Sequence, residues 1–178
     1  MKDYILVGFD PASTRNIGWS ILTLTKEEDT PTKIVNWEGG TFVMGDTQER
    51  WQVLWPMFMI FDTFLTDHKP DLVVVEKTSS FAGGFITGQV SHCMGVLLAV
   101  CGKYNVPVDF VFPTSVKKGV AGHGRASKTL LKKAVISNLA KFDIHVKKFH
   151  SQHTADATAN LFFWLMKNNI SGLKLNGE

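Results

Sequence analysis

The chain has 178 residues and a mass of 19.8 kDa, which suits one domain, because a single hydrophobic core commonly holds about 100–200 residues. A content of 44% hydrophobic and 20% charged residues excludes a disordered, collagen-like or fibrous chain. No apolar run approaches the roughly 20 residues of a transmembrane helix, and the N-terminus has no signal-peptide pattern, so we expect an intracellular protein of the cytoplasm.

The first part of the chain favours strands. Residues 4–10 and 17–23 are β-rich runs separated by a turn-forming cluster, which predicts a hairpin, and a third strand is expected over residues 33–43. Residues 46–49 resemble a capping box, and apolar side chains then recur at helical spacing, with a kink or a broken first part expected at Pro56. Many of these side chains are aromatic, from Trp51 to Phe64. We interpret the aromatic stripe as core packing and assign it no cofactor.

The middle of the chain predicts a buried strand followed by a helix. Residues 71–76 form a continuous apolar run, which is typical of a strand covered on both faces in a sheet with parallel members. A glycine-marked loop over residues 79–84 leads into a helix over residues 85–103. The helix contains Cys93 and Cys101, which lack metal-site spacing and are expected to be reduced, buried thiols.

The last part of the chain predicts one strand and two helices. The strand covers residues 106–112, and after Pro113 a loop rich in Lys and Gly precedes a helix that starts near residue 126 or 127. The final helix covers residues 151–167. The predicted fold class is therefore α/β, a single domain over residues 1–170 with a mixed five-stranded sheet flanked by helices, followed by a loose tail over residues 171–178.

Positive charge is concentrated in one block. The formal charge of the whole chain is only +3, but residues 113–148 contain nine lysines and arginines against Asp143 alone. Such a block indicates either a cationic face for a polyanion or a solvated helix surface. We favour the cationic face because Gly, His and Ser residues lie between the charges.

Acidic residues at the ends of apolar strands indicate a metal site. Asp10 ends the first strand and Glu76 ends the most buried one, and a carboxylate removed from water is costly unless it is paired or binds a metal. His153 and Asp156 lie three residues apart at the start of the last helix, on one face. This oxygen-rich set suits Mg²⁺ or Mn²⁺ rather than zinc, and can hold two ions for hydrolysis of a phosphodiester.

Each of these residues also has a simpler interpretation. Asp10 alone fits a turn before Pro11, Glu76 alone fits an ion pair with Lys69 or Lys77, and Asp156 fits the positive end of a helix dipole. The joint order of the four is more specific than any one of them.

Four segments together resemble the RuvC family of Holliday junction resolvases, within the RNase H-like superfamily. Residues 5–13 with the later Gly18 are similar to the family's opening motif, and residues 71–76 to its second acidic strand. Residues 113–128 are similar to its basic loop and following helix start, and residues 153–157 to its closing acidic motif. The resemblance spans nearly the whole chain and implies an RNase H-like nuclease domain over residues 1–170.

The resemblance implies a Mg²⁺-dependent endodeoxyribonuclease that resolves four-way junctions by paired nicks. Two ions per site are expected, with Mn²⁺ as a substitute. The catalytic and metal-binding residues would be Asp10, Glu76, His153 and Asp156. For His153, binding an ion and activating water both remain open.

The resemblance also implies partners. The DNA-binding residues would be Lys117, Lys118, Arg125, Lys128 and Phe81. Family members act as homodimers, and Gly88, Ser91 and Gly95 in the helix after Glu76 would allow close approach of a second copy, although packing on the protein's own sheet explains them equally well. A branch-migration partner is not identified by the sequence.

Two departures from the family pattern limit the transfer. Ala12 replaces the usual second glycine of the opening motif, and the aromatic wedge expected just after the second acid is out of register, with Ser79 in its place and Phe81 two residues later. The alternatives are a ribonuclease of the RNase H or RuvX type, a junction-binding module without cleavage, and, last, an actin-like ATPase, which needs two related domains.

Overall fold

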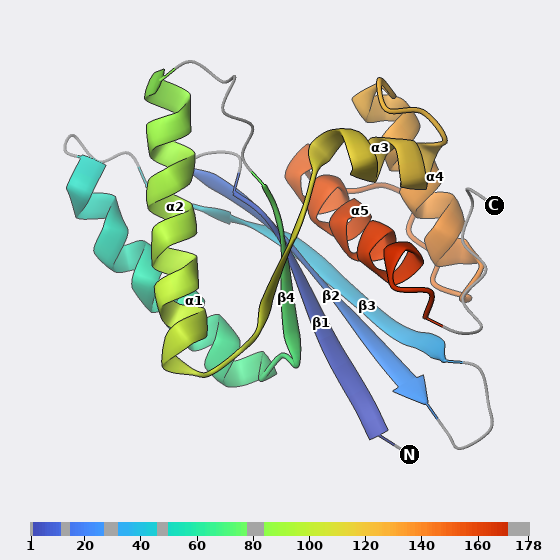
Figure 1. Ribbon diagram of the computed structural model, residues 1–178, viewed down its shortest axis with the longest axis horizontal. Coiled ribbons are helices and arrows are strands. Elements are labelled where there is room, and N and C mark those ends of the chain that lie inside the picture. The colour runs from blue at the N-terminus through green and yellow to red at the C-terminus, as the bar shows by residue number, and fades with distance from the viewer. Residues whose placement is uncertain (1, 12–14, 27–31, 46–49, 78–83, 171–178) are drawn as a thin grey trace.

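The central sheet contains five strands in the order β3-β2-β1-β4-β5 (Figure 1). The computed structural model describes residues 2–11, 15–26, 32–45, 50–77 and 84–170. The strands are β1 Lys2–Asp10, β2 Asn16–Lys26, β3 Lys33–Val43, β4 Leu72–Glu76 and β5 Val108–Val111. β1, β2 and β3 pair antiparallel, whereas β4 is parallel to both β1 and β5. The predicted mixed five-stranded α/β sheet is confirmed.

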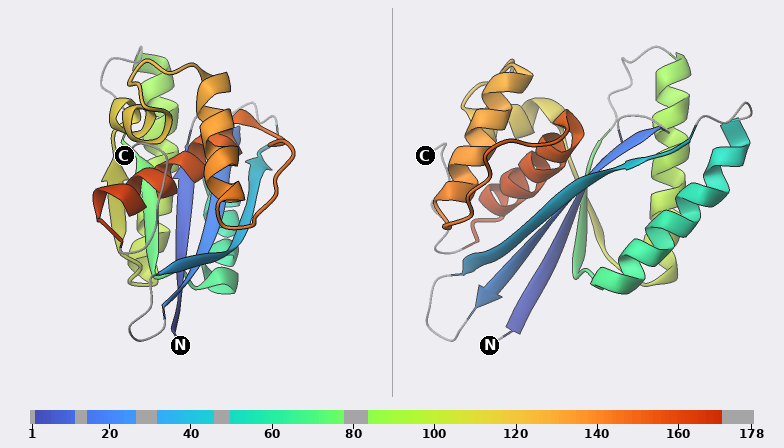
Figure 2. Two further views of the ribbon diagram at one scale, coloured as in Figure 1. Left: turned by 90° about the vertical axis from the view of Figure 1, so that its right-hand side faces the viewer. Right: turned by 180° about the vertical axis from the view of Figure 1, so that it is seen from behind.

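Helices cover both faces of the sheet (Figure 2). A short 3-10 helix, η1 (Arg50–Val53), leads into α1 (Leu54–His68), which packs with α2 (Gly84–Lys103) on one face. The other face carries α3 (Pro113–Ala121), α4 (Lys128–Ala140) and α5 (Gln152–Lys167). Within the described ranges, no helix is both long and apolar enough to cross a membrane.

Alternation along the strands builds a separate core on each face. In β1, Leu6 packs among residues of α3, α4 and α5, whereas Val7 and Phe9 pack against α1 and α2. In β4, Val74 takes the first side and Val75 the second. Successive strand residues point to opposite faces of a sheet. Asp10 comes two residues after Gly8 and Glu76 two residues after Val74, and both of these positions face α5. The side chains of Asp10 and Glu76 are therefore also directed toward α5.

The helix α5 lies unusually close to the sheet. A Cβ built on Gly8 would stand 2.4 Å from the carbonyl oxygen of Ala157, and one built on Gly18 would stand 2.2 Å from the carbonyl oxygen of His153. Polar contacts fix the same interface, since Thr154 of α5 donates from Oγ1 to the backbone carbonyl of Gly40 in β3 at 2.8 Å. The two glycines thus let the N-terminal turns of α5 reach the ends of the strands.

The predicted loop after Pro113 is wrong, because residues 113–121 form the helix α3. Pro113 lies at the first helical turn, where its missing N–H is not needed for a helix hydrogen bond. Gly122, with φ of 76°, ends the helix in the left-handed conformation that favours glycine. Lys117 and Lys118 are therefore presented on a rigid helix rather than on a loop.

Most of the other predicted elements are confirmed. The helix after residue 46 begins with η1, and Pro56 lies in the first turn of α1, in agreement with the expected broken first part. Cys93 and Cys101 are buried free thiols, and burial raises their pKa values to about 12 and about 11. The capping box at 46–49, the loop over 79–83 and the tail over 171–178 lie outside the described residues, so these three remain predictions, and so does the domain division.

Candidate active site

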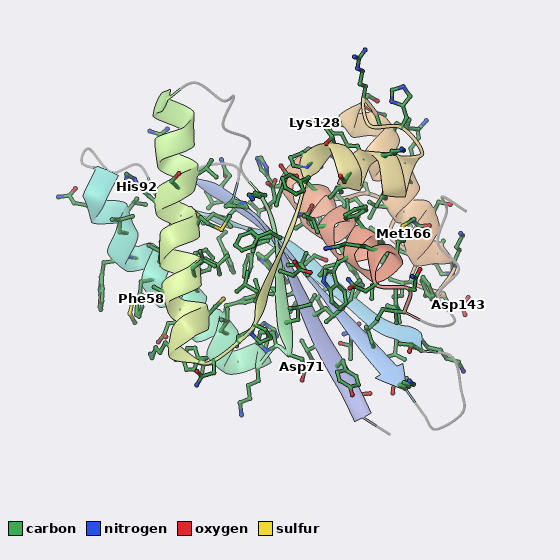
Figure 3. The ribbon with its side chains drawn as sticks, in the orientation of Figure 1. Phe58, Asp71, His92, Lys128, Asp143 and Met166 are labelled. Carbon is green, nitrogen blue, oxygen red and sulfur yellow. The ribbon has the colours of Figure 1, made fainter. Side chains whose placement is uncertain are left out.

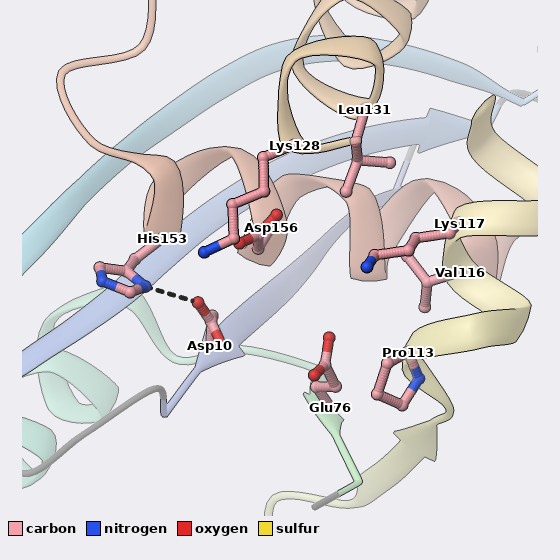
Figure 4. A pocket seen from close by; sticks show the side chains of 9 residues that line it. All are labelled: Asp10, Glu76, Pro113, Val116, Lys117, Lys128, Leu131, His153 and Asp156. Atoms are coloured by element: carbon pink, nitrogen blue, oxygen red, sulfur yellow. Dashed lines mark hydrogen bonds and ion pairs between the residues drawn. The ribbon is translucent and has the colours of Figure 1, made fainter. Parts of the chain in front are cut away.

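Two parallel strands bring the first two acids to one edge of the sheet. Phe9 of β1 is paired with Val75 of β4, so Asp10 and Glu76 follow at the same level at the carboxyl ends of neighbouring strands. Asp10 is buried, with a relative exposure of 7%, and Glu76 is half-buried. Asp10 and Glu76 line the same pocket (Figure 4). The simpler interpretations, of Asp10 as a turn former and of Glu76 as a partner of Lys77 or Lys69, do not account for this shared position.

The start of α5 supplies the other two predicted residues. Ser151 caps the helix by accepting a hydrogen bond from the backbone N–H of Thr154, which fixes the first turn. Asp10, His153 and Asp156 each offer one donor atom, and these atoms all lie within 4.8 Å of one another. Figure 4 shows these side chains and that of Glu76 directed into the same pocket.

Two hydrogen bonds orient the donors. His153 donates from Nδ1 to Oδ2 of Asp10 at 2.9 Å, which leaves Nε2 as the ring nitrogen not engaged with that carboxylate. Gln152 donates from Nε2 to Oδ1 of Asp156 at 2.8 Å. Gln152 was not identified from the sequence, although its i, i+4 spacing to Asp156 on a helix is the signal that would have indicated the contact.

Burial and neighbouring carboxylates raise the pKa values of two of the acids, Glu76 and Asp156. Burial, followed by the charges of Asp10 and Asp156, raises the pKa of Glu76 to about 7. Burial, followed by the charge of Asp10, raises the pKa of Asp156, and the hydrogen bond from Gln152 partly opposes that shift. The hydrogen bond to Asp10 is the largest cause that raises the pKa of His153. Burial and neighbouring negative charge thus favour the protonated forms of Glu76 and Asp156.

Two lysines also line the pocket, which has a volume of about 240 Å³. Lys117 comes from α3, and Lys128 is the first residue of α4, whose N-cap Ser127 accepts a hydrogen bond from the backbone N–H of Leu130. Lys118 and Arg125 are exposed and do not line the pocket. Phe81 lies outside the described residues, and its stacking role remains a prediction.

The donor set fits a hard divalent cation. Carboxylate oxygens with one imidazole are ligands that suit Mg²⁺ or Mn²⁺, and a cation among them would offset the repulsion that raises the pKa of Glu76. Lysines beside such a cluster provide positive charge for an anionic substrate. The four residues predicted from the sequence are therefore brought together in one pocket with two of the predicted DNA-contacting lysines, while the role of each residue remains a prediction.

Comparison with known proteins identifies the family. The family model described as crossover junction endodeoxyribonuclease RuvC matches residues 6–161, so the chain belongs to the RuvC family. The chain is 26% identical over 124 residues to the crossover junction endodeoxyribonuclease RuvC of Rickettsia prowazekii, covering 70% of this chain and 75% of the relative. It is 23% identical over 159 residues to that of Orientia tsutsugamushi strain Ikeda, covering 89% and 92%.

The fold is also that of a solved family member. RuvC of Thermus thermophilus superposes with a TM-score of 0.74 at 20% sequence identity, covering 94% of this chain and 98% of that one. A structure of the Thermus protein in complex with Holliday junction substrate superposes with a TM-score of 0.72 at 16% identity, with the same two coverages. The RNase H-like fold expected from the sequence is thereby confirmed.

Proposed function

We propose that this protein is a structure-selective endodeoxyribonuclease that resolves four-way DNA junctions by paired nicks, using divalent metal ions to hydrolyse phosphodiester bonds. The observation that carries the proposal is the meeting of Asp10, His153 and Asp156 within 4.8 Å, in one pocket with Glu76, in a chain of the RuvC family. The Thermus relative, solved with Holliday junction substrate, supports the choice of DNA.

The metal in this proposal is Mg²⁺, with two ions per site and Mn²⁺ as a substitute. Asp10, Glu76, His153 and Asp156 would hold the ions, which supply an activated water nucleophile and stabilise the leaving 3′ oxygen. Gln152 keeps the carboxylate of Asp156 turned into the pocket, and Asp10 keeps the imidazole of His153 beside it. The close carboxylates favour the proposal because each raises the cost of leaving the cluster without a cation.

The lysines of the pocket act on the DNA backbone. Lys117 and Lys128 line the same pocket as the acids, where their charge stabilises the negative charge that develops on the phosphate during cleavage. Lys118 and Arg125, which are exposed beyond the pocket, contact phosphates farther along the strand. Phe81 stacks on an exposed base at the junction centre.

The functional unit in this proposal is a homodimer with one active site for each of two paired strands. A Cβ at Gly88 or Gly95 of α2 would meet nothing within 4 Å, so close packing on the protein's own sheet does not account for these glycines. Gly95 is exposed, and so is Leu98 on the same helix. This outer face of α2 is the surface we assign to the second copy.

The test compares three substrates with and without Mg²⁺: a synthetic four-way DNA junction, plain duplex DNA and an RNA–DNA hybrid. We expect paired nicks in the junction alone, and only with metal. Cleavage of the hybrid would favour a ribonuclease of the RNase H or RuvX type, and junction binding without any cleavage would favour a non-cleaving binding module.

The site assignment is tested by Asp10→Asn, which keeps the size of the side chain and removes its charge. Cleavage is expected to fall by about a thousandfold, because a bound metal stabilises such a transition state by several kcal/mol. Junction affinity, measured by fluorescence anisotropy in EDTA, should stay within about twofold. Asp67→Asn, at an exposed position of α1, is the matched control and should cleave normally. Normal cleavage by Asp10→Asn would refute the assignment.

A further inference from the structure

The connection between α4 and α5, residues 141–151, contains no helix or strand but follows a defined course across the surface. It leaves α4 beyond Ala140 and returns to Ser151, the N-cap of the helix that carries His153 and Asp156 (Figure 2). Figure 3 labels Lys128 at the start of α4 and Asp143 just after its end. Since α4 has 13 residues, the connection runs back over about 20 Å of surface toward the active site.

Apolar side chains anchor this connection to the protein. Phe149 is buried and packs edge to face on Trp37, with ring centroids 5.5 Å apart. Trp37 is itself held by the hydrogen bonds from its Nε1 to Ser20 and Thr158. Ile144 and Val146 pack against the same core, so the course of the connection is fixed by contacts on its inner side.

The outer side of the connection is cationic. Lys147 and Lys148 are both exposed, directly beside the buried Phe149. Neither forms an ion pair with any residue in the part of the chain that the structure describes. Asp143, the one acid of the connection, lies at its remote end, at a turn with φ of 60°. Two uncompensated charges are thus presented on a backbone that needs little further ordering on binding.

We infer that Lys147 and Lys148 form a second DNA contact, which binds backbone phosphates of a junction arm away from the phosphate that is cut. The inference rests on the proposed function. Lys147 and Lys148 lie four and three residues before Ser151, a span of at most about 14 Å of extended chain. Phosphates along one strand of a duplex are about 3.4 Å apart along the axis, so this span corresponds to about four nucleotides from the start of α5. The contact therefore holds the arm that leaves the active site and carries no sequence preference, because it engages phosphates and no base edges.

The experiment measures binding of a long-armed junction by the full-length protein in EDTA, so that binding is read without cleavage. For Lys147→Ala/Lys148→Ala, affinity is expected to fall about tenfold at low salt, and the slope of log Kd against log salt to decrease by about two. Lys147→Arg/Lys148→Arg keeps both charges and should restore the affinity. An affinity and a salt slope equal to those of the wild type would overturn the inference.

A modified junction locates the contact. Neutral methylphosphonates placed about three to eight nucleotides from the cut should weaken binding of the wild type but cause little further loss for the double alanine variant, because both changes remove one interaction. Independent, additive losses would place the lysines on phosphates outside the modified stretch, and would overturn the inference.

Lys69→Asn is the matched control. Lys69 is an exposed lysine that ends α1 with φ of 45°, a conformation that asparagine tolerates, and it lies away from the connection on the other side of the sheet. Its loss should leave both Kd and the salt slope unchanged. A wild-type protein that neither binds nor cuts the junction would instead refute the proposed function, so the two failures are distinguishable.

Discussion

The grouping of Asp10, Glu76 and Asp156 in one partly buried pocket is the central property of the site at the scale of single residues. The pKa of Glu76 is raised to about 7, from 4.5 for an exposed glutamate, first by burial and then by its two acidic neighbours. Between these two pH values the unfolded chain has released a proton that the folded chain retains. The stability of the metal-free protein therefore falls as the pH rises through this window, by up to about 3 kcal/mol from this group.

Two neighbouring groups act in the same direction. The pKa values of His153 and Asp156 are also raised, so each of them holds its proton more tightly in the folded state than in the unfolded one. Their contributions to stability are likewise lost as the pH rises. In the proposed function a divalent cation would reverse this trend, because it would bind the deprotonated carboxylates and therefore bind more tightly at pH 8 than at pH 6.

Glu76→Gln should therefore stabilise the metal-free protein at pH 8, by up to about 3 kcal/mol, and make little difference at pH 4. Thermal unfolding in EDTA at the two pH values measures this change. Mg²⁺ should raise the Tm of the wild type more than that of the variant. Glu38→Gln, at an exposed position of β3, is the control and should show neither effect. A variant no more stable than the wild type at pH 8 would contradict the proposed repulsion.

The sequence allowed Asp10, Glu76, His153 and Asp156 to be named because each stands out from its surroundings, as an acid at the end of an apolar run or in a His-x-x-Asp pair. It did not indicate Gln152, whose role depends on the direction of one side chain. The sequence also could not predict the hydrogen bond between His153 and Asp10, because the two residues are 143 positions apart.

At the scale of elements, the approach of α5 to β2 sets the geometry of the site. The backbone of His153 occupies the space where a side chain at Gly18 would begin. This is a contact with backbone atoms, which cannot turn aside as a flexible side chain would. The position of the imidazole beside Asp10 therefore depends on a glycine in a strand that contributes no donor of its own.

Gly18→Ala should consequently displace the first turn of α5. We expect a loss of about 2–4 kcal/mol in the free energy of unfolding, as for overpacking in a core, together with a large loss of cleavage. Gly102→Ala, in α2, is the matched substitution: its Cβ would meet nothing within 4 Å, and it should stabilise the protein by about 0.5–1 kcal/mol through helix propensity. Urea denaturation of both variants measures the difference. Equal stabilities would contradict the close approach.

Sequence patterns predicted most elements because their hydrophobic periods were clear, as in β4 and α5. They failed at α3, where Gly119 lowered the apparent helix propensity and, with Gly122 and Gly124 close behind it, favoured a loop. Tertiary contact overrides that local preference, since Val116 and Val120 are buried and Gly119 lies against the ring of Phe163.

At the scale of the whole molecule, the two faces of the sheet have different tasks in the proposed function. The face with α3, α4 and α5 carries the pocket and the basic residues, whereas the face with α1 and α2 carries the surface assigned to a second copy (Figures 1 and 2). Separation of these tasks allows two copies to present two active sites to one junction.

Gly95→Arg should disrupt the dimer, because two-fold symmetry would bring the two new charges close together. Sedimentation equilibrium should show a monomer. On a supercoiled plasmid with an extruded cruciform, the variant should give nicked circles where the wild type gives linear product. Gly45→Arg, at another exposed glycine with open space around it, should remain dimeric. A dimeric Gly95→Arg with paired cleavage would move the interface away from α2.

The pairing of Asp10 with His153 and Asp156 has a consequence for biosynthesis. A growing polypeptide that has emerged only as far as α4 has its first two acids but lacks the remaining donors, and the sheet edge has no helix to complete it. In the proposed function, a partial translation product that ends before α5 therefore has no nuclease activity, which begins only after this late, long-range folding.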